Sequence, residues 1–265
     1  QRAVENFPIS GMTISKSMIR ALGIIKRSAA VVNHKLGILD KKRKNSIVQA
    51  ADEVIKGKYN DQFPIDTFQT GSGTSSNMNC NEIIANRASE LMGGQIGTRE
   101  PVHPNNHVNM GQSSNDVIPT AIHIAANMEI HNSLIPALQN VANELDQKAQ
   151  EFAGIVKIGR THLQDATPIT LGQEFSGYCQ MVKNGMQRLQ NVQKHLSELA
   201  QGGTAVGTGI NTKIEFGQLM AQEISRFSGI TFTEAVNHFE AQAAQDAAVE
   251  TSGALKTVAV SLSKI

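Results

Sequence analysis

Apolar residues recur at alternating spacings of three and four through the second half of the chain. The clearest run consists of Phe175, Tyr178, Val182, Gly185, Leu189, Val192, Leu196 and Leu199. This spacing predicts a helix that packs along one seam in a bundle. Thr167 and Pro168 are typical of an N-cap and first turn, and Gly202 is typical of a helix stop, so one helix is predicted between them.

A second seam of the same spacing precedes it. Its members are Val117, Ala121, Ile124, Met128, His131, Ile135, Leu138, Ala142, Leu145, Ala149 and Phe152. Pro136 is expected to bend this helix or to unwind one turn, because proline removes a backbone donor. His131 lies on the seam, away from other chemical groups, so we interpret it as a packed or interface histidine.

A third stretch, from Leu255 through Val258 and Leu262 to Ile265, repeats the pattern up to the last residue. No cap or helix breaker precedes the end of the sequence. We therefore interpret the chain as an internal portion of a longer protein.

The first part of the chain has shorter predicted helices, at Ser15–Leu36 and Asn45–Lys56, followed by a stretch broken by proline and glycine at Gly57–Thr70. The basic run Lys41–Lys44 lacks interleaved aromatic residues, so it indicates a solvated loop and helix start. Together the patterns predict an all-α fold: a small helical domain over 1–111, then a long-helix bundle over 112–265 that is truncated at its C-terminal end.

Composition narrows the possible partners. The formal net charge is +1, which disfavours nucleic acid or an anionic membrane as a partner. Charged residues make up 18%, below the roughly 25% usual for soluble domains, while no apolar run is long enough to span a bilayer. Low charge with helix-forming apolar residues indicates packing that continues into a subunit interface, hence an oligomer. Cys80 and Cys179 form neither a disulfide framework nor a metal motif.

Two polar segments stand directly before predicted helices. Gly71–Asn79 reads GSGTSSNMN, and His103–Asp116 ends in Ser113, Ser114, Asn115 and Asp116. Backbone amides and neutral hydroxyls at a helix N-terminus suit a carboxylate or phosphate. The alternative for each segment is a capping loop with no ligand, although N-capping by Ser114 or Asn115 accounts for only one of these residues.

Histidines accompany these segments. His103 and His107 have the spacing of a helical metal pair, but Pro104 argues against a helix and no third ligand is near, so no metal is predicted. The third polar segment, Gly159–Pro168, reads GRTHLQDATP. It places His162, beside Thr161, in a loop at a predicted helix start, a position suited to proton transfer.

The strings GSGTSSNMN, QSSND and GRTHLQDATP resemble those of class II fumarases in the fumarase/aspartase superfamily. Further similarity lies in GGTAVGTGIN at Gly202–Asn211 and NHFEAQAAQDA at Asn237–Ala247. The resemblance implies reversible hydration of fumarate to L-malate without a metal or organic cofactor. It also implies a homotetramer in which the three segments of each site come from different chains, working in a bacterial cytoplasm or, in a eukaryote, the mitochondrial matrix.

The resemblance assigns roles by motif. Donors to the substrate carboxylates are expected from Ser72, Thr74, Ser113, Ser114, Asn115 and Thr161. His162 is expected to hold and activate the water. A second carboxylate site is implied at His103 and Asn105, although Asn106 stands where the family commonly has Asp and the nearby arginine is displaced to Arg99.

The family's flexible serine loop, of the GSS-x-x-P-x-K-x-N type, has no counterpart between Gln1 and Ile265. The 265 residues alone are therefore predicted to be inactive. Two alternatives stay open. One is an aspartate or related ammonia-lyase, whose third motif typically carries Gln in place of His162, and the other is a non-catalytic helical scaffold such as the lens crystallins of this superfamily.

Overall fold

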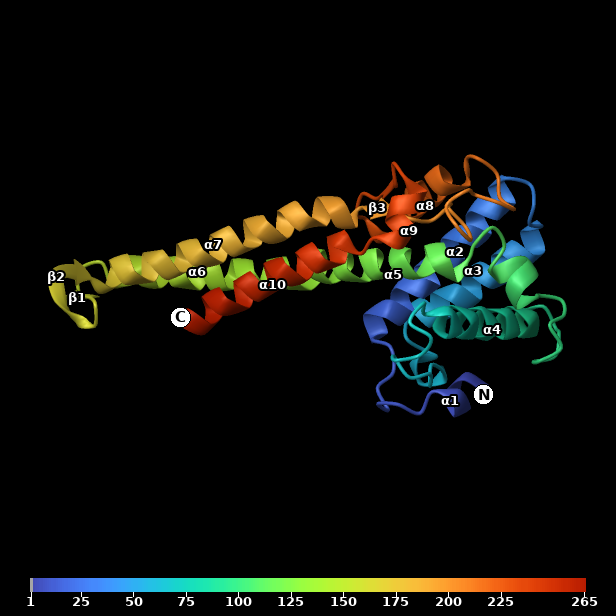
Figure 1. Ribbon diagram of the computed structural model, residues 1–265, viewed down its shortest axis with the longest axis horizontal. Helices are drawn as coiled ribbons and strands as arrows, with labels where there is room; N and C mark the ends of the chain where they lie inside the picture. Colours follow the sequence, from blue (N-terminus) through green and yellow to red (C-terminus); the bar gives the residue numbers. More distant parts are fainter. Residues whose placement is uncertain (1) are drawn as a thin grey trace. The chain divides into compact units, whose positions relative to one another are not determined.

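The computed structural model describes residues 2–265 and is built mainly of helices (Figure 1). This confirms the predicted fold class. The helices are α1 (Arg2–Asn6), α2 (Lys16–Lys35), α3 (Lys41–Ile55), α4 (Thr74–Leu91), α5 (Ser114–Glu129), α6 (Ile135–Glu151), α7 (Leu171–Leu196), α8 (Phe216–Ser228), α9 (His238–Ala243) and α10 (Asp246–Lys264). The strands are β1 (Val156–Thr161), β2 (Gln164–Thr170), β3 (Glu198–Leu199) and β4 (Thr233–Glu234).

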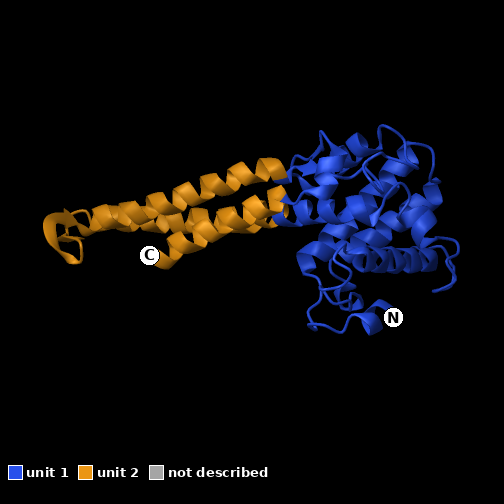
Figure 2. Ribbon diagram, in the orientation of Figure 1, with its two compact units in different colours: residues 1–126, 196–245 blue, residues 127–195, 246–265 orange. Residues whose placement is uncertain are grey.

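Contacts divide the described residues into two units, coloured separately in Figure 2. Unit 1 comprises residues up to 126 and residues 196–245, and unit 2 comprises residues 127–195 and 246–265. The domain boundary near Gly111 that the sequence suggests stays a prediction. It falls just before the first residue of α5.

Unit 1 is organised around α2, which packs against α3, α4 and α8. Ser15 caps α2 by accepting the amide of Met18 (3.2 Å), as the predicted bounds require. Apolar residues of α2, including Leu22 and Ile25, are fully buried. Helix α3 begins earlier than the predicted start at Asn45, because Asp40 caps it and the basic run Lys41–Lys44 forms its first turn. A cap ahead of the lysines explains why the helix begins before the apolar pattern does.

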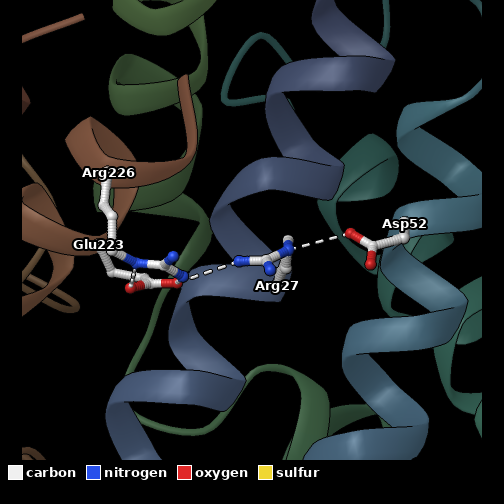
Figure 3. A network of polar contacts seen from close by, with 4 residues as sticks. All are labelled: Arg27, Asp52, Glu223 and Arg226. Atoms are coloured by element: carbon white, nitrogen blue, oxygen red, sulfur yellow. Dashed lines mark hydrogen bonds and ion pairs between the residues drawn. The ribbon is translucent and has the colours of Figure 1, made fainter. Parts of the chain in front are cut away.

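An ion network holds the helices around α2 together (Figure 3). Arg27 Nε lies 2.9 Å from Asp52 of α3, and Arg27 Nη1 lies 3.0 Å from Glu223 of α8. Glu223 also pairs with Arg226 of its own helix at 2.6 Å. The network therefore fixes α8, and the chain that leads to it, against the core of unit 1.

Unit 2 contains the long helices α6, α7 and α10 together with the β1–β2 hairpin (Figure 1). The predicted seam of α7 is confirmed, since Val182, Leu189, Val192 and Leu196 are buried. Met186 is also buried, so the apolar face is wider than the heptad pattern alone indicates. On α10, Val258 is buried and packs over Gly185, where an added Cβ would lie 3.1 Å from it.

The predicted start of α7 at Thr167 and Pro168 is wrong, because both residues lie in β2. Helix α7 begins at Leu171 and ends at Leu196, before the predicted stop at Gly202. Its start is fixed by a reciprocal capping box. The amide of Gln173 donates to Thr170 Oγ1 (3.1 Å), and the amide of Thr170 donates to Gln173 Oε1 (2.9 Å).

Pro136 follows a local unwinding, as predicted. Residues Ile130–Leu134 form a π-helical turn, after which Pro136 occupies the first turn of α6. His131 is exposed while Ile130 is 3% exposed, so His131 is not packed within this chain, and its interpretation as an interface histidine stays a prediction. A π turn closes i→i+5 hydrogen bonds and has more residues per turn than an α-helix, so it shifts which residue faces inward.

Candidate functional site

In the first polar segment, Gly71–Asn79, both the backbone conformation and a close helix contact require a glycine at position 73. Gly73 has a φ of 68° and directly precedes α4, whose first turn receives no side-chain cap from it. An added Cβ at Gly73 would lie 2.8 Å from Ile118 of α5. The glycine therefore lets the N-terminus of α4 approach α5. In the first turn of α4, Gln69 Oε1 accepts the amide of Ser76 at 3.0 Å.

The second polar segment, His103–Asp116, leads into α5 and caps its N-terminus with side chains. Ser113 Oγ accepts the amide of Asn115 at 3.3 Å, and Asp116 Oδ1 accepts the amide of Ser113 at 2.9 Å. This reciprocal pair is the capping-box arrangement. The capping residue is thus Ser113, and not Ser114 or Asn115 as the sequence suggests.

A chain of hydroxyls joins the two segments. Thr70 and Ser72 lie 3.2 Å apart at their Oγ atoms, Ser72 and Thr74 lie 2.9 Å apart, and Thr74 Oγ1 donates to Ser114 Oγ at 3.0 Å. The expectation that all three segments come from different chains is wrong for the first two, which meet within this chain.

The number of protons that the hydroxyls carry fixes the direction of the hydrogen bonds between them. Each hydroxyl has one proton, and Thr74 uses its proton on Ser114, so Ser72 must donate to Thr74 and Thr70 to Ser72. Ser114 is the last member, and its own proton is left for a further acceptor. Hydrogen bonds that run in one direction polarise one another, so Ser114 is a strengthened donor.

Both segments open onto a cleft of about 580 Å³. It is lined by Gly71, Ser72, Ser114, Asn115, Ile118, Pro119, Ile122, Ala205, Val206, Phe239, Gln242, Ala243 and Gln245. Ala205 and Val206 belong to the glycine-rich run Gly202–Asn211, so this run forms part of the cleft wall. Asn115 is held against this run, because its Nδ2 donates to the carbonyl of Ala205 at 2.6 Å.

Two buried charges beside the cleft were given no role by the sequence motifs. Asp116 is fully buried, and burial raises the pKa of its carboxyl group to about 6, against the lowering effect of three backbone amides and Lys26. Lys26 is also fully buried, which lowers the pKa of its amino group to about 8. Its Nζ donates to Asn109 Oδ1 (2.8 Å) and Gln112 Oε1 (3.0 Å), directly before Ser113.

Sequence signals for both charges existed. Asp116 is part of the quoted QSSND string, and Lys26 directly follows Ile24 and Ile25 on the apolar face of α2. A charge on the buried face of a helix needs hydrogen-bond partners, which here come from the loop that leads into α5.

The third polar segment, Gly159–Pro168, lies in the β1–β2 hairpin and includes its tip. His162 and Leu163 have φ values of 48° and 60° and connect β1 to β2, with Thr161 paired to Gln164 across the turn. The prediction of a loop is confirmed, but the predicted position at a helix start is wrong, because β2 intervenes before α7. Both His162 and Thr161 are exposed. They belong to unit 2, whereas the cleft residues belong to unit 1.

The residues of the implied second carboxylate site form their own small structure. Pro104–Val108 is a π-helical turn, so the argument from Pro104 against a helix is wrong. Proline is tolerated there because it occupies the first position, where an amide lacks a helical partner anyway. His103 Nδ1 accepts the amides of Asn105 (3.1 Å) and Asn106 (3.2 Å). Carboxylate binding at His103 and Asn105 stays a prediction.

Within the described residues 2–265, no cluster of three or more His, Cys, Asp or Glu side chains is arranged to hold a metal ion. None of the helices in that range has the length and apolar character needed to cross a membrane.

Comparison with known proteins places the chain. A protein-family model described as "Lyase" matches residues 1–265. The chain belongs to this lyase family. Within it, the chain is 61% identical over 247 residues to the class II fumarate hydratase of Halobacterium salinarum, covering 93% of this chain and 52% of that protein. It is 58% identical to the mitochondrial fumarate hydratase of Saccharomyces cerevisiae, covering 100% of this chain and 54% of that protein.

Solved structures of this lyase family show the same fold. The class II fumarase of Schistosoma mansoni matches with a TM-score of 0.96 and 38% identity over 98% of this chain and 58% of that chain. A protein described as fumarate lyase:delta crystallin from Brucella melitensis matches with a TM-score of 0.95 and 43% identity over 99% of this chain and 57% of that chain. The resemblance to class II fumarases is confirmed. The chain spans about half the length of the curated relatives it matches.

Proposed function

We propose that the full-length protein containing this chain adds water reversibly to fumarate to give L-malate. The observation that carries the proposal is the directed hydroxyl chain that ends on Ser114 at the mouth of the cleft. It presents neutral donors at the N-termini of α4 and α5, where a carboxylate is favoured. The similar proteins named fumarate hydratases support the choice of dicarboxylate.

The reaction explains why neutral donors suit this cleft. Removing a proton from the carbon next to a carboxylate pushes negative charge onto that carboxylate, so the site must stabilise a more highly charged oxygen pair. We assign this role to Ser72, Thr74, Ser113, Ser114 and Asn115. Fixed donors need no reorganisation as the charge develops. The capping box and the contact of Asn115 with Ala205 fix two of them, Ser113 and Asn115.

We assign His162 the general acid/base role on the water that adds to the double bond, with Thr161 as a further carboxylate donor. Both residues stand at an exposed hairpin tip, where His162 has a φ of 48° and Thr161 pairs with Gln164. Positive φ at a non-glycine residue is costly and is concentrated at functional sites. An exposed tip is able to reach a cleft in a neighbouring subunit.

Assembly follows from this assignment. We propose a homotetramer in which the hairpin of one chain completes the cleft of another. Exposed apolar residues of α10, including Leu255, Val260 and Leu262, support packing against further helices. The expected location is a bacterial cytoplasm or, as for the yeast relative, a mitochondrion.

The test is a kinetic comparison in the full-length protein. His162→Asn removes the titrating ring and is expected to lower kcat for fumarate hydration by about 100-fold or more, since general acid/base groups contribute about that much. The loss of fumarate absorbance measures it. His131→Asn changes an exposed histidine of the same unit and is the matched control. Equal kcat in the two variants would remove His162 from the mechanism.

A further inference from the structure

Asp116 makes more contacts than its capping role needs. One oxygen, Oδ1, accepts the amide of Ser113 and completes the capping box of α5. A cap of this kind ordinarily sits at the surface and needs one oxygen. Here the carboxylate is fully buried, which costs free energy unless both oxygens are well paired.

The second oxygen reaches a different part of the chain. Asp116 Oδ2 accepts the amide of Thr204 (2.9 Å), the amide of Gly202 (3.3 Å) and the side-chain Nε2 of Gln201 (3.1 Å). These three donors come from the turn that leads directly into Ala205 and Val206 of the cleft wall. The positive φ values of Gly202 (111°) and Thr204 (56°) allow the turn to curl its amides around one oxygen.

The same turn also contacts α9, which contributes to the cleft lining. Gln242 of α9, which lines the cleft, donates its Nε2 to the carbonyl of Thr204 at 2.6 Å. Asn115, the neighbour of Asp116, donates to the carbonyl of Ala205. The carboxylate therefore stands at a junction between the donors of α5, the glycine-rich turn and α9.

We propose that Asp116 is the positioning residue of the cleft, setting the distance between the donors Ser113–Asn115 and the turn 201–206, whose Ala205 and Val206 line the cleft. It acts through its neighbours and does not line the cleft itself. The inference rests on the proposed dicarboxylate function for its ligand, although the clamp between Asp116 and the turn is a separate physical claim.

The test uses Asp116→Asn in the full-length protein. An amide has one acceptor oxygen, so it is able to serve Ser113 or the turn but not both. Hydrogen exchange of the segment 201–206 measures the clamp and is expected to become faster. The dissociation constant for succinate, an unreactive dicarboxylate, is expected to rise about tenfold, as is KM for fumarate, which corresponds to one hydrogen bond to a charged group.

Asp66→Asn is the matched control. Asp66 is also a buried carboxylate that accepts backbone amides, from Ser10 (2.6 Å), Gly11 (2.8 Å) and Phe68 (2.8 Å), and none of these lines the cleft. It is expected to leave the succinate dissociation constant unchanged. A general loss of folded protein would lower apparent kcat in both variants without raising that constant, so the two explanations separate.

Gln201→Met answers the same question if Asp116→Asn does not fold. It removes one of the three donors at nearly constant volume, and Gln201 Oε1 has no hydrogen-bond partner to lose. A rise of about threefold in the succinate dissociation constant is expected. Unchanged exchange at 201–206, or faster exchange with unchanged succinate binding, overturns the proposal. Wild-type protein that binds succinate but does not hydrate fumarate overturns the proposed function alone.

Discussion

Thr74 and Ser114 are the pair of side chains through which the N-termini of two helices share one hydrogen bond. Their separation of 40 positions in the sequence means that the bond reports tertiary structure rather than a local turn. Because Thr74 donates and Ser114 accepts, the loss of either leaves the other without its partner. The effects of substituting Thr74 and Ser114 are therefore expected to be coupled.

We predict that Thr74→Val and Ser114→Ala each raise KM for fumarate about tenfold in the full-length protein. The double variant is expected to raise KM by clearly less than the product of the two, because both single changes break one shared bond. Steady-state kinetics on the four proteins measures this. Thr257→Val is a control, since Thr257 is exposed on α10 and bonds only to Gly253 of its own helix. Strictly multiplicative effects would show that the two hydroxyls act independently.

For single residues, the sequence identified the donor side chains better than it identified the residues that those side chains contact. Ser72, Ser114 and Asn115 were predicted as donors and line one cleft, and the predicted donor Thr74 bonds to Ser114 beside them. Asp116 was overlooked because its importance comes from residues 201–204, which lie far away in the sequence. A capping pattern is local and visible, whereas a contact across 88 positions is not.

At the scale of elements, hydrophobic periodicity located the helices and capping chemistry decided where they begin. Ser15 and Asp40 begin α2 and α3, while α7 begins only after Thr170 and Gln173 cap each other. The Thr167–Pro168 signal misled because proline also fits an exposed two-stranded hairpin, which has solvent on its open edges. The hairpin itself has few apolar contacts, so no periodic signal marks it.

The junction between α6 and α7 depends on one small residue. An added Cβ at Gly172 would lie 2.3 Å from the carbonyl of Ala149 and 2.9 Å from the backbone of Ala153. We predict that Gly172→Ala lowers the free energy of unfolding by about 2 kcal/mol, because backbone must move. Gly177→Ala, on the same helix with nothing within 4 Å, is expected to stabilise by about 1 kcal/mol. Thermal or urea unfolding distinguishes them, and equal effects would contradict the close approach.

At the scale of the whole molecule, the candidate residues divide between two units. Ser72, Thr74 and Ser113–Asn115 belong to unit 1, while Thr161 and His162 belong to unit 2. The sequence revealed all three segments through their motifs, and two of them meet around one cleft. Assembly of the third was implied only by family resemblance, because hydrophobic patterns describe which faces are buried and not which chain covers them.

We propose that the cleft between the N-termini of α4 and α5 binds fumarate and that the full-length protein hydrates it. The most direct measurement is proton NMR of fumarate mixed with the purified full-length protein, with the 265-residue chain in a parallel sample. We expect the fumarate signal to be replaced by those of malate with the full-length protein, and the shorter chain to give no conversion. Unchanged fumarate with the full-length protein, or release of ammonia from aspartate in its place, would contradict it.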